Sequence, residues 1–367
     1  MPMLEPMIAT AYRSAKAYWE DTVSESRLPT AYGRIFPARQ DWLDKAPAED
    51  ILEPDLEIID THHHFWDEPG RYLLDDLLAD TGSGHNVVAT VFIECRSHYR
   101  AGGPEELRPV GEVEFVARIA EESERRGGTR AAAGIVGFAD LTLGDQLEPV
   151  LEALTDSASG RLRGIRHAAG WDADPVIGNN HHGAGPGFYL RDDFQQGLRR
   201  LAAKDLVLDG LVYHPQHADL LALARACPEA RIVMNHTGMP LGYGAYAGRR
   251  EEVYATWRSG MEAIAACPNV DLKLGGMMMR LAAYDYNAVP APPSSAELAD
   301  HWRPYIEPCI ELFGPERCTF ESNYPVDKMG IGYAALWNAF KRIAAGASDD
   351  EKRALFAGTA RRIYRLS

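Results

Sequence analysis

The stretch "IIDTHHHFWD", residues 58–67, joins a short apolar run to three consecutive histidines. The run predicts a buried strand, with the polar residues at its C-terminal end. Because alternate residues of a strand share a face, Asp60, His62 and His64 are predicted to point one way and His63 the other. If His62 and His64 face the interior of a barrel, two imidazoles meet at the end of this strand.

Further β-rich runs follow, and helix patterns lie between them. The strand candidates are 57–60, 86–95, 130–140, 162–168, 206–214, 231–238, 269–276 and 318–325. Helical spacing is clear at Leu147, Val150, Leu151 and Leu154 and less complete at Phe194, Leu198 and Leu201. Two more helices are predicted over 333–346 and 348–366, the second with Ser348 as N-cap. Eight strands, each followed by a helix, predict an α/β fold of the (β/α)8 TIM-barrel type and not a doubly wound sheet.

Residues 1–56 do not follow this pattern. They contain one helix candidate, at about 8–20, and a stretch interrupted by prolines. We interpret 1–56 as an N-terminal extension packed on a barrel formed by 57–367. The extension is a candidate subunit contact, and we expect a homo-oligomer.

Composition narrows the class of protein. Of 367 residues, 46% are hydrophobic and 25% charged, which suits a globular core. The net charge of −15 disfavours a nucleic-acid partner, and no apolar run reaches the ~18 residues of a membrane span. The N-terminus lacks the apolar segment of a secretory signal. Five cysteines without a CxxC pair predict buried thiols in a reducing cytoplasm.

Polar side chains recur where the predicted strands end. They are Glu94 on the second strand, Arg166 and His167 on the fourth, Tyr213 and His214 on the fifth, His236 on the sixth, Lys273 on the seventh and Asn323 on the eighth. A single histidine in such a run is more often structural than catalytic. Barrel interiors are otherwise apolar, however, and barrel active sites lie at the C-terminal ends of the strands. The long connections 170–190 and 277–297 leave the same ends, and loops of that length are usually functional.

The chain resembles the amidohydrolase superfamily, in particular the amidohydrolase-related branch that includes pyrone dicarboxylate lactonase. The resemblance rests on "DTHHHFWD", "VMNHTGMP", "VDLKLGG", "FESNYPVD" and the C-terminal "FAGTARRIYRL", and covers roughly residues 57–367. It implies a hydrolytic site at the barrel mouth, with His62 and His64 on strand one. His236 would act on the water or on the substrate carbonyl.

Asn323 departs from the family pattern, which usually reads S-D-x-P on strand eight. An amide cannot accept the proton of an attacking water, and it brings no charge to a metal. Asn323 is then either an amide that orients substrate or the mark of an inactive relative. His236 or Glu94 would serve as the base in its place, and Asp327 is a weaker candidate.

The resemblance leaves two possibilities for a metal ion. His62 and His64, with a third histidine from strand five or six, would suit one divalent ion such as zinc. Without the strand-eight carboxylate the site lacks a charged ligand unless Glu94 contributes. Some members of the branch hydrolyse lactones without metal, so a metal-independent site is the other possibility.

Several residues are candidates for binding a substrate carboxylate or carbonyl. They are Arg166, His167, His181, His182, Tyr213, His214 and Lys273, beside a predicted apolar wall of Met277, Met278, Met279, Tyr284 and Tyr286. We predict a hydrolase that opens a lactone, or a similar cyclic ester or amide, of a small organic acid. The alternatives are a metal-dependent decarboxylase of the same superfamily and a catalytically inactive binding or scaffold barrel.

Overall fold

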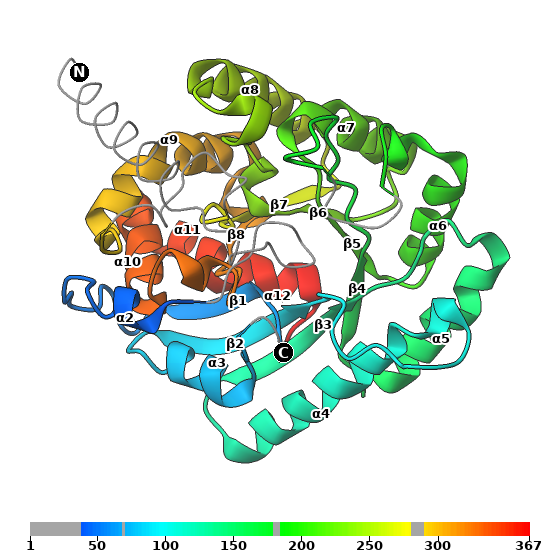
Figure 1. The fold of residues 1–367 in the computed structure, drawn as a ribbon, viewed down its shortest axis with the longest axis horizontal. Helices are drawn as coiled ribbons and strands as arrows, with labels where there is room; N and C mark the ends of the chain where they lie inside the picture. Colours follow the sequence, from blue (N-terminus) through cyan, green and yellow to red (C-terminus); the bar gives the residue numbers. More distant parts are fainter. Residues whose placement is uncertain (1–37, 68–69, 179–183, 280–289) are drawn as a thin grey trace.

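The computed structural model describes residues 38–67, 70–178, 184–279 and 290–367. Its centre is a sheet of eight parallel strands in the order β1 to β8 (Figure 1). The strands are β1 Glu57–His63, β2 Asn86–Ile93, β3 Arg130–Gly137, β4 Leu162–Arg166, β5 Val207–Gly210, β6 Ile232–Met234, β7 Val270–Leu274 and β8 Cys318–Phe320. All eight predicted strands are present. Most are shorter than predicted, because the polar residues at their ends belong to the loops.

Contacts between the first and last strands close the sheet into a barrel. The Thr61 hydroxyl donates to the Phe320 carbonyl at 2.9 Å, and the His64 amide donates to the Tyr324 carbonyl at 2.7 Å. His63 and Tyr324 also form a parallel bridge. The (β/α)8 barrel predicted from the sequence is therefore confirmed.

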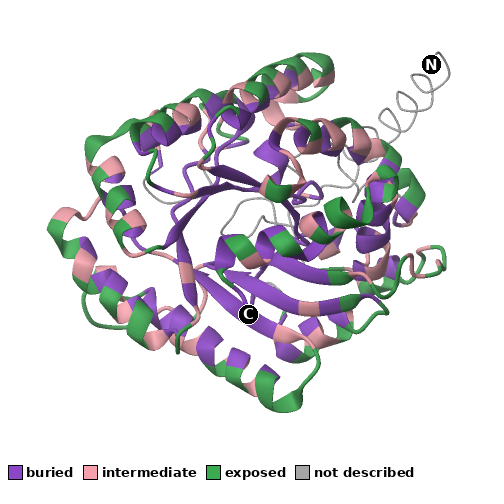
Figure 2. Cartoon of the chain, turned by 180° about the vertical axis from the view of Figure 1, so that it is seen from behind, coloured by how far each residue is buried: buried purple, intermediate pink, exposed green. Residues whose placement is uncertain are grey.

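Helices surround the strands and turn their apolar faces inward, so that burial is greatest on the strands and on the inner helix faces (Figure 2). The α5 residues Leu147, Val150, Leu151 and Leu154 are buried, as their spacing predicts. The helices are α2 Gln40–Leu43, α3 Leu74–Thr81, α4 Val110–Arg126, α5 Leu147–Ser157, α6 Asp192–Ala203, α7 His217–Ala226, α8 Arg250–Ala265, α9 Ser295–Phe313, α10 Tyr333–Ile343, α11 Asp349–Arg353 and α12 Thr359–Tyr364.

The C-terminal helices pack against the N-terminal end of the barrel, and α12 lies across the ring of strands in Figure 1. Ile363 and Tyr364 of α12 share one apolar cluster with inward side chains such as Val91 and Val207. The single helix predicted over 348–366 is divided, because a π-helical turn at Ala354–Gly358 separates α11 from α12. Ser348 caps α11 as predicted.

The described part of the N-terminal extension lies on α10. Lys341 donates hydrogen bonds to the carbonyls of Leu52 and Glu53, both at 2.8 Å, and Asn338 donates to the Asp50 carbonyl at 2.9 Å. The predicted helix at 8–20 lies outside the described residues. The division at residue 56 and the homo-oligomer stay predictions.

Two sequence-based expectations about the whole chain can be compared with the structure. All five cysteines are free and buried, as predicted. Across the residues that the structure describes, no helix combines the length and apolarity needed to cross a membrane.

Candidate active site

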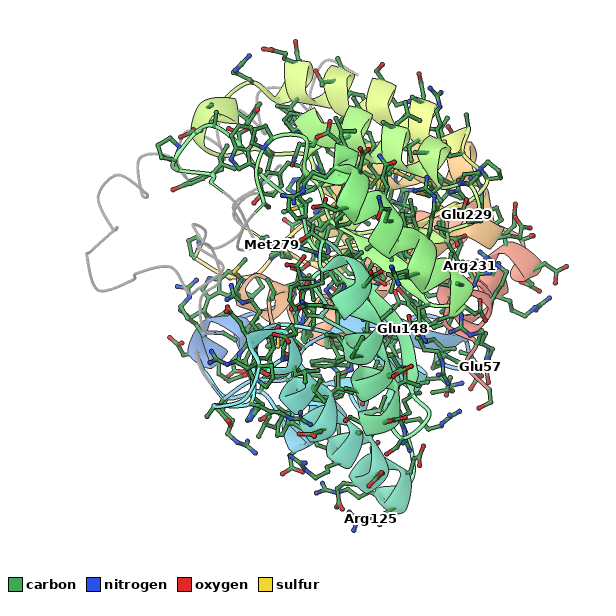
Figure 3. All side chains as sticks on the ribbon, turned by 90° about the vertical axis from the view of Figure 1, so that its right-hand side faces the viewer. Glu57, Arg125, Glu148, Glu229, Arg231 and Met279 are labelled. Carbon is green, nitrogen blue, oxygen red and sulfur yellow. The ribbon has the colours of Figure 1, made fainter. Side chains whose placement is uncertain are left out.

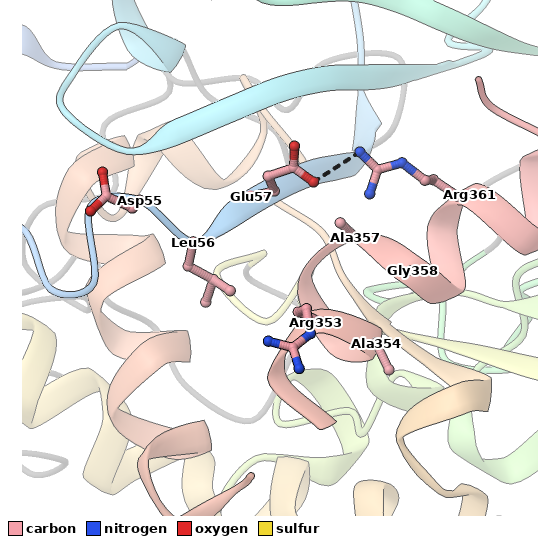
Figure 4. Close-up of a pocket in the computed structure, with 8 residues that line it drawn as sticks. All are labelled: Asp55, Leu56, Glu57, Arg353, Ala354, Ala357, Gly358 and Arg361. Carbon is pink, nitrogen blue, oxygen red and sulfur yellow. Dashed lines mark hydrogen bonds and ion pairs between the residues drawn. The ribbon is translucent and has the colours of Figure 1, made fainter. Parts of the chain in front are cut away.

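The two ends of the barrel differ in chemistry. Glu57 begins β1 at one end and Met279 follows β7 at the other, on opposite sides of the molecule in Figure 3. A cavity of about 550 Å³ lies beside Glu57, at the N-terminal end (Figure 4). Its polar groups include an ion pair between Arg361 and Glu57, and alanine and glycine form part of its wall. Buried imidazoles and carboxylates gather instead at the opposite end, so we place the candidate site there.

Five buried side chains from five strand ends form a continuous series of contacts at the C-terminal end. Glu94 accepts a hydrogen bond from Arg166 Nε at 2.8 Å, and Arg166 Nη1 lies 3.3 Å from His62 Nε2. His62 Nδ1 lies 2.8 Å from Glu321 Oε2, and His236 Nδ1 lies 2.7 Å from Glu321 Oε1. The predicted residues His62, Glu94, Arg166 and His236 therefore lie in one cluster.

Glu321 occupies the centre of this cluster, although the sequence analysis did not select it. Its Oε1 atom also accepts the backbone N–H of His236 at 3.0 Å. The stretch "FESNYP" contains this carboxylate directly after the strand and two residues before Asn323.

His62 and His64 lie together, with ring centroids 4.9 Å apart, while His63 lies in a different environment. His63 packs against the rings of Phe65 and Phe92, which belong to the core between the barrel and the helices. The predicted alternation of the three histidines is thus observed.

Asp60 does not follow that alternation. It accepts hydrogen bonds from the Ser322 amide at 2.9 Å and from the hydroxyl of Tyr333, a residue of the outer helix α10. The pairing of β1 with β2 shifts register between Asp60 and His63, and such a bulge turns the preceding residue to the other face.

Burial sets the protonation of the imidazoles. It lowers the pKa of His62 well below the usual range, and the positive charge of Lys273 adds to the shift. It also lowers the pKa of His64, with a further contribution from Arg166. His64 Nδ1 lies 2.8 Å from the Ile93 carbonyl, so neutral His64 carries its proton on Nδ1 and leaves Nε2 as an acceptor.

Asn323 and Lys273 are paired with residues outside the series. The Asn323 amide donates to Asp327 Oδ1 at 2.9 Å, and burial raises the pKa of Asp327 well above its usual range. Lys273 forms a buried ion pair with Asp209 at 2.6 Å, below the histidines in the barrel interior. Their predicted roles in orienting and binding substrate stay predictions.

The other predicted substrate-binding residues have neighbours outside the series. His167 packs its ring against Phe138, Phe188 and Phe194. Tyr213 belongs to a small apolar cluster, and the ring of His214 lies 4.9 Å from that of Tyr246.

The loops that were expected to line the site are described in part. Met277 and Met278 are buried and Met279 is half-buried. His181, His182, Tyr284 and Tyr286 lie outside the described residues.

Three side chains have the chemistry of a metal site. Each of His62, His236 and Glu321 offers one donor atom, and these atoms lie within 4.8 Å of one another. His62 Nδ1 and Glu321 Oε2 are close, but their orientation is not that of a hydrogen bond, and neither has another such partner in the described part of the chain. Two nitrogens and a carboxylate oxygen are a donor set that hydrolytic zinc sites use, so the residues fit a divalent ion.

Comparison with known proteins agrees with this geometry. A sequence profile of the family described as amidohydrolase matches residues 59–366. The chain belongs to the amidohydrolase family. The resemblance inferred from the strand-end motifs is thereby confirmed.

Relatives of this amidohydrolase cover most of its length. An L-fucono-1,5-lactonase of Burkholderia multivorans is 27% identical over 327 residues, 84% of this chain and 96% of that protein. An uncharacterised protein of Sinorhizobium fredii is 30% identical over 85% of this chain and 99% of its own length. A crystal structure of a Burkholderia multivorans amidohydrolase with bound zinc has 27% identity and a TM-score of 0.66, and covers 84% of this chain and 99% of that one.

Proposed function

We propose that this amidohydrolase opens a lactone, or a similar cyclic ester or amide, of a small organic acid by adding water. The observation that carries the proposal is the buried series from Glu94 through Arg166, His62 and Glu321 to His236. The relative named L-fucono-1,5-lactonase supports lactones as the substrate class.

A positive charge beside the carbonyl is the first requirement of this reaction. The guanidinium of Arg166 is held in place by Glu94 on one side and faces His62 on the other. A cation fixed in this way stabilises the oxyanion that forms when water attacks the carbonyl. A divalent metal ion held by His62, His236 and Glu321 would supply further charge to polarise the carbonyl and acidify the water.

A proton acceptor is the second requirement. Glu94 Oε2 is buried and has no hydrogen-bond partner among the described residues, while Oε1 accepts from Arg166. We assign Glu94 Oε2 as the acceptor of the proton from water. Water adds to the carbonyl carbon, the ring C–O bond breaks, and the proton passes from Glu94 to the departing alkoxide. His236 is the alternative acceptor in a metal-free site, where its Nδ1–H donates to Glu321 and leaves Nε2 free to take the proton.

A panel of small lactones tests the proposal, with acid release followed by a pH indicator. The panel includes sugar 1,5-lactones and pyrone carboxylates. We expect turnover of at least one lactone, and a loss of about 10²–10⁴-fold in Glu94→Gln. Asp271→Asn is the control, since Asp271 pairs with Arg362 at the N-terminal end of β7. CO₂ release from an aromatic carboxylate, without hydrolysis of any lactone, would identify the decarboxylase alternative.

A further inference from the structure

Two polar side chains follow strand β8 and have different partners. Asn323 stands where the family pattern usually has aspartate, and its amide donates to Asp327 at 2.9 Å. The amide brings no charge to the imidazoles. Glu321, two residues earlier, places a carboxylate between His62 and His236.

The two oxygens of Glu321 are used differently. Oε1 accepts both the backbone N–H and Nδ1–H of His236, at 3.0 and 2.7 Å. Oε2 lies 2.8 Å from His62 Nδ1 without hydrogen-bond alignment, and both atoms are buried. A buried carboxylate oxygen and a buried imidazole nitrogen are costly to leave without a partner, and a cation between them would satisfy both.

Two glycines after β7 make room for this arrangement. A Cβ atom on Gly275 would lie 2.6 Å from Glu321 Cγ, and a Cβ on Gly276 would lie 2.0 Å from His236 Nδ1. Gly276 also has a φ of +65°, which side chains disfavour. The backbone therefore approaches the pair as closely as it can, and a larger residue would displace one of them.

We propose that this chain binds a divalent metal ion through His62, His236 and Glu321. The charged ligand is Glu321 and not the residue at position 323. The carboxylate of the site thus stands two residues before the position where the family pattern usually has aspartate. Glu321 directly follows β8, and its two oxygens reach His62 and His236, whereas Asn323 contacts Asp327. Two imidazole nitrogens with one carboxylate oxygen favour zinc over magnesium or calcium, which prefer all-oxygen sites. The inference deepens the proposed hydrolytic site and rests on it.

Metal affinity, measured apart from catalysis, tests the assignment. Protein stripped of metal is titrated with zinc against a chelating indicator, and with cobalt while its visible absorption is recorded. We expect one zinc ion per chain in the wild type. Glu321→Gln should weaken zinc binding by more than about 100-fold, and Glu321→Asp should bind cobalt with an altered spectrum. Asp271→Asn, which removes a buried carboxylate at the other end of the barrel, should bind as the wild type does.

Thermal unfolding with and without zinc distinguishes a folded variant that has lost the metal site from a variant that does not fold. Zinc should raise the Tm of the wild type and of Asp271→Asn but leave that of Glu321→Gln unchanged. Equal zinc affinity in the wild type and Glu321→Gln would overturn the assignment, as would a wild type that binds no zinc. Lactone hydrolysis by a wild type that binds no zinc would overturn the inference and leave the proposed function standing. Zinc binding that depends on Glu321, without hydrolysis of any lactone, would support the inference and overturn the proposed function.

Discussion

The guanidinium of Arg166 and the imidazole of His62 meet at 3.3 Å between Nη1 and Nε2. Arginine has only donors, so in the protein without metal His62 Nε2 is the acceptor and neutral His62 carries its proton on Nδ1, a proton that a metal ion bound at Nδ1 would displace. Burial and nearby positive charges lower the pKa of His62, which agrees with a neutral ring. Arg166 thus determines which nitrogen of His62 faces the carboxylate.

Replacing Arg166 by lysine tests this orientation. The single ammonium of lysine cannot contact Glu94 and His62 as the planar guanidinium does. We expect kcat/KM of Arg166→Lys to fall by about 10–100-fold with the fold intact. Steady-state kinetics with circular dichroism checks this, and wild-type kinetics in the variant would contradict it.

The three adjacent histidines should respond differently to alanine. His62→Ala and His64→Ala should lose activity, because His62 belongs to the cluster and the His64 ring lies 4.9 Å from the His62 ring. His63→Ala should mainly lose stability, by about 2–4 kcal/mol, because it leaves a cavity beside Phe65 and Phe92. Urea unfolding and initial rates on all three variants separate the two effects. Loss of activity confined to the His63 variant would mean that His63, and not His62 and His64, faces the active site.

Asn323→Asp should destabilise the fold. The variant exchanges an N–H donor for a second carboxyl beside Asp327, whose pKa burial already raises. One of the two carboxyls must keep a proton that the unfolded chain releases, so the loss of stability should grow as the pH rises. We expect about 1–3 kcal/mol at neutral pH. Urea unfolding at pH 5.5 and 8 measures it, and a variant as stable as the wild type at both pH values would refute the role of the amide as donor.

Glu112 of α4 predicts a second pH dependence. Burial, together with the nearby Glu94 carboxylate, raises the pKa of Glu112 from 4.5 to about 8. The folded protein holds this proton up to about pH 8, whereas the unfolded chain loses it near pH 4.5. The stability from this group is therefore lost as the pH rises between these values.

Glu112→Gln removes the titration but keeps an oxygen that accepts the amides of Cys95 and Ser97. Relative to the variant, the wild type should lose at least about 1 kcal/mol of unfolding free energy between pH 5 and 8.5. Parallel stability curves for the two proteins would show that Glu112 does not titrate in this range.

The strand order and most of the cluster followed from the sequence because they depend on local patterns. The period of two separates His63 from its neighbours, and polar residues at strand ends identify His62, Glu94, Arg166 and His236. Asp60 could not be placed in this way, since a register shift depends on the neighbouring strand.

Contacts between residues far apart in the chain could not be predicted from the sequence pattern either. Lys273 was predicted to contact substrate, but its partner is Asp209, 64 residues earlier in the chain. Glu321 was missed because a glutamate next to a motif does not show which imidazoles it will reach. Depth within the barrel is decided by strand stagger, which the pattern of a single strand does not contain.

The Asp209 carboxylate links the barrel interior to the order in which the chain is synthesised. Its Oδ1 atom accepts from Lys273 at 2.6 Å and its Oδ2 atom from the Tyr364 hydroxyl at 2.8 Å, and these partners follow it by 64 and 155 residues. A nascent chain that has reached β5 carries this carboxylate with neither partner made, and burying it then would be costly. We therefore expect Asp209 to stay hydrated until both partners have been synthesised. We expect the strands to close around it only after α12, which supplies Tyr364, has emerged, so that completion of the barrel waits for a residue 155 positions beyond the β5 carboxylate.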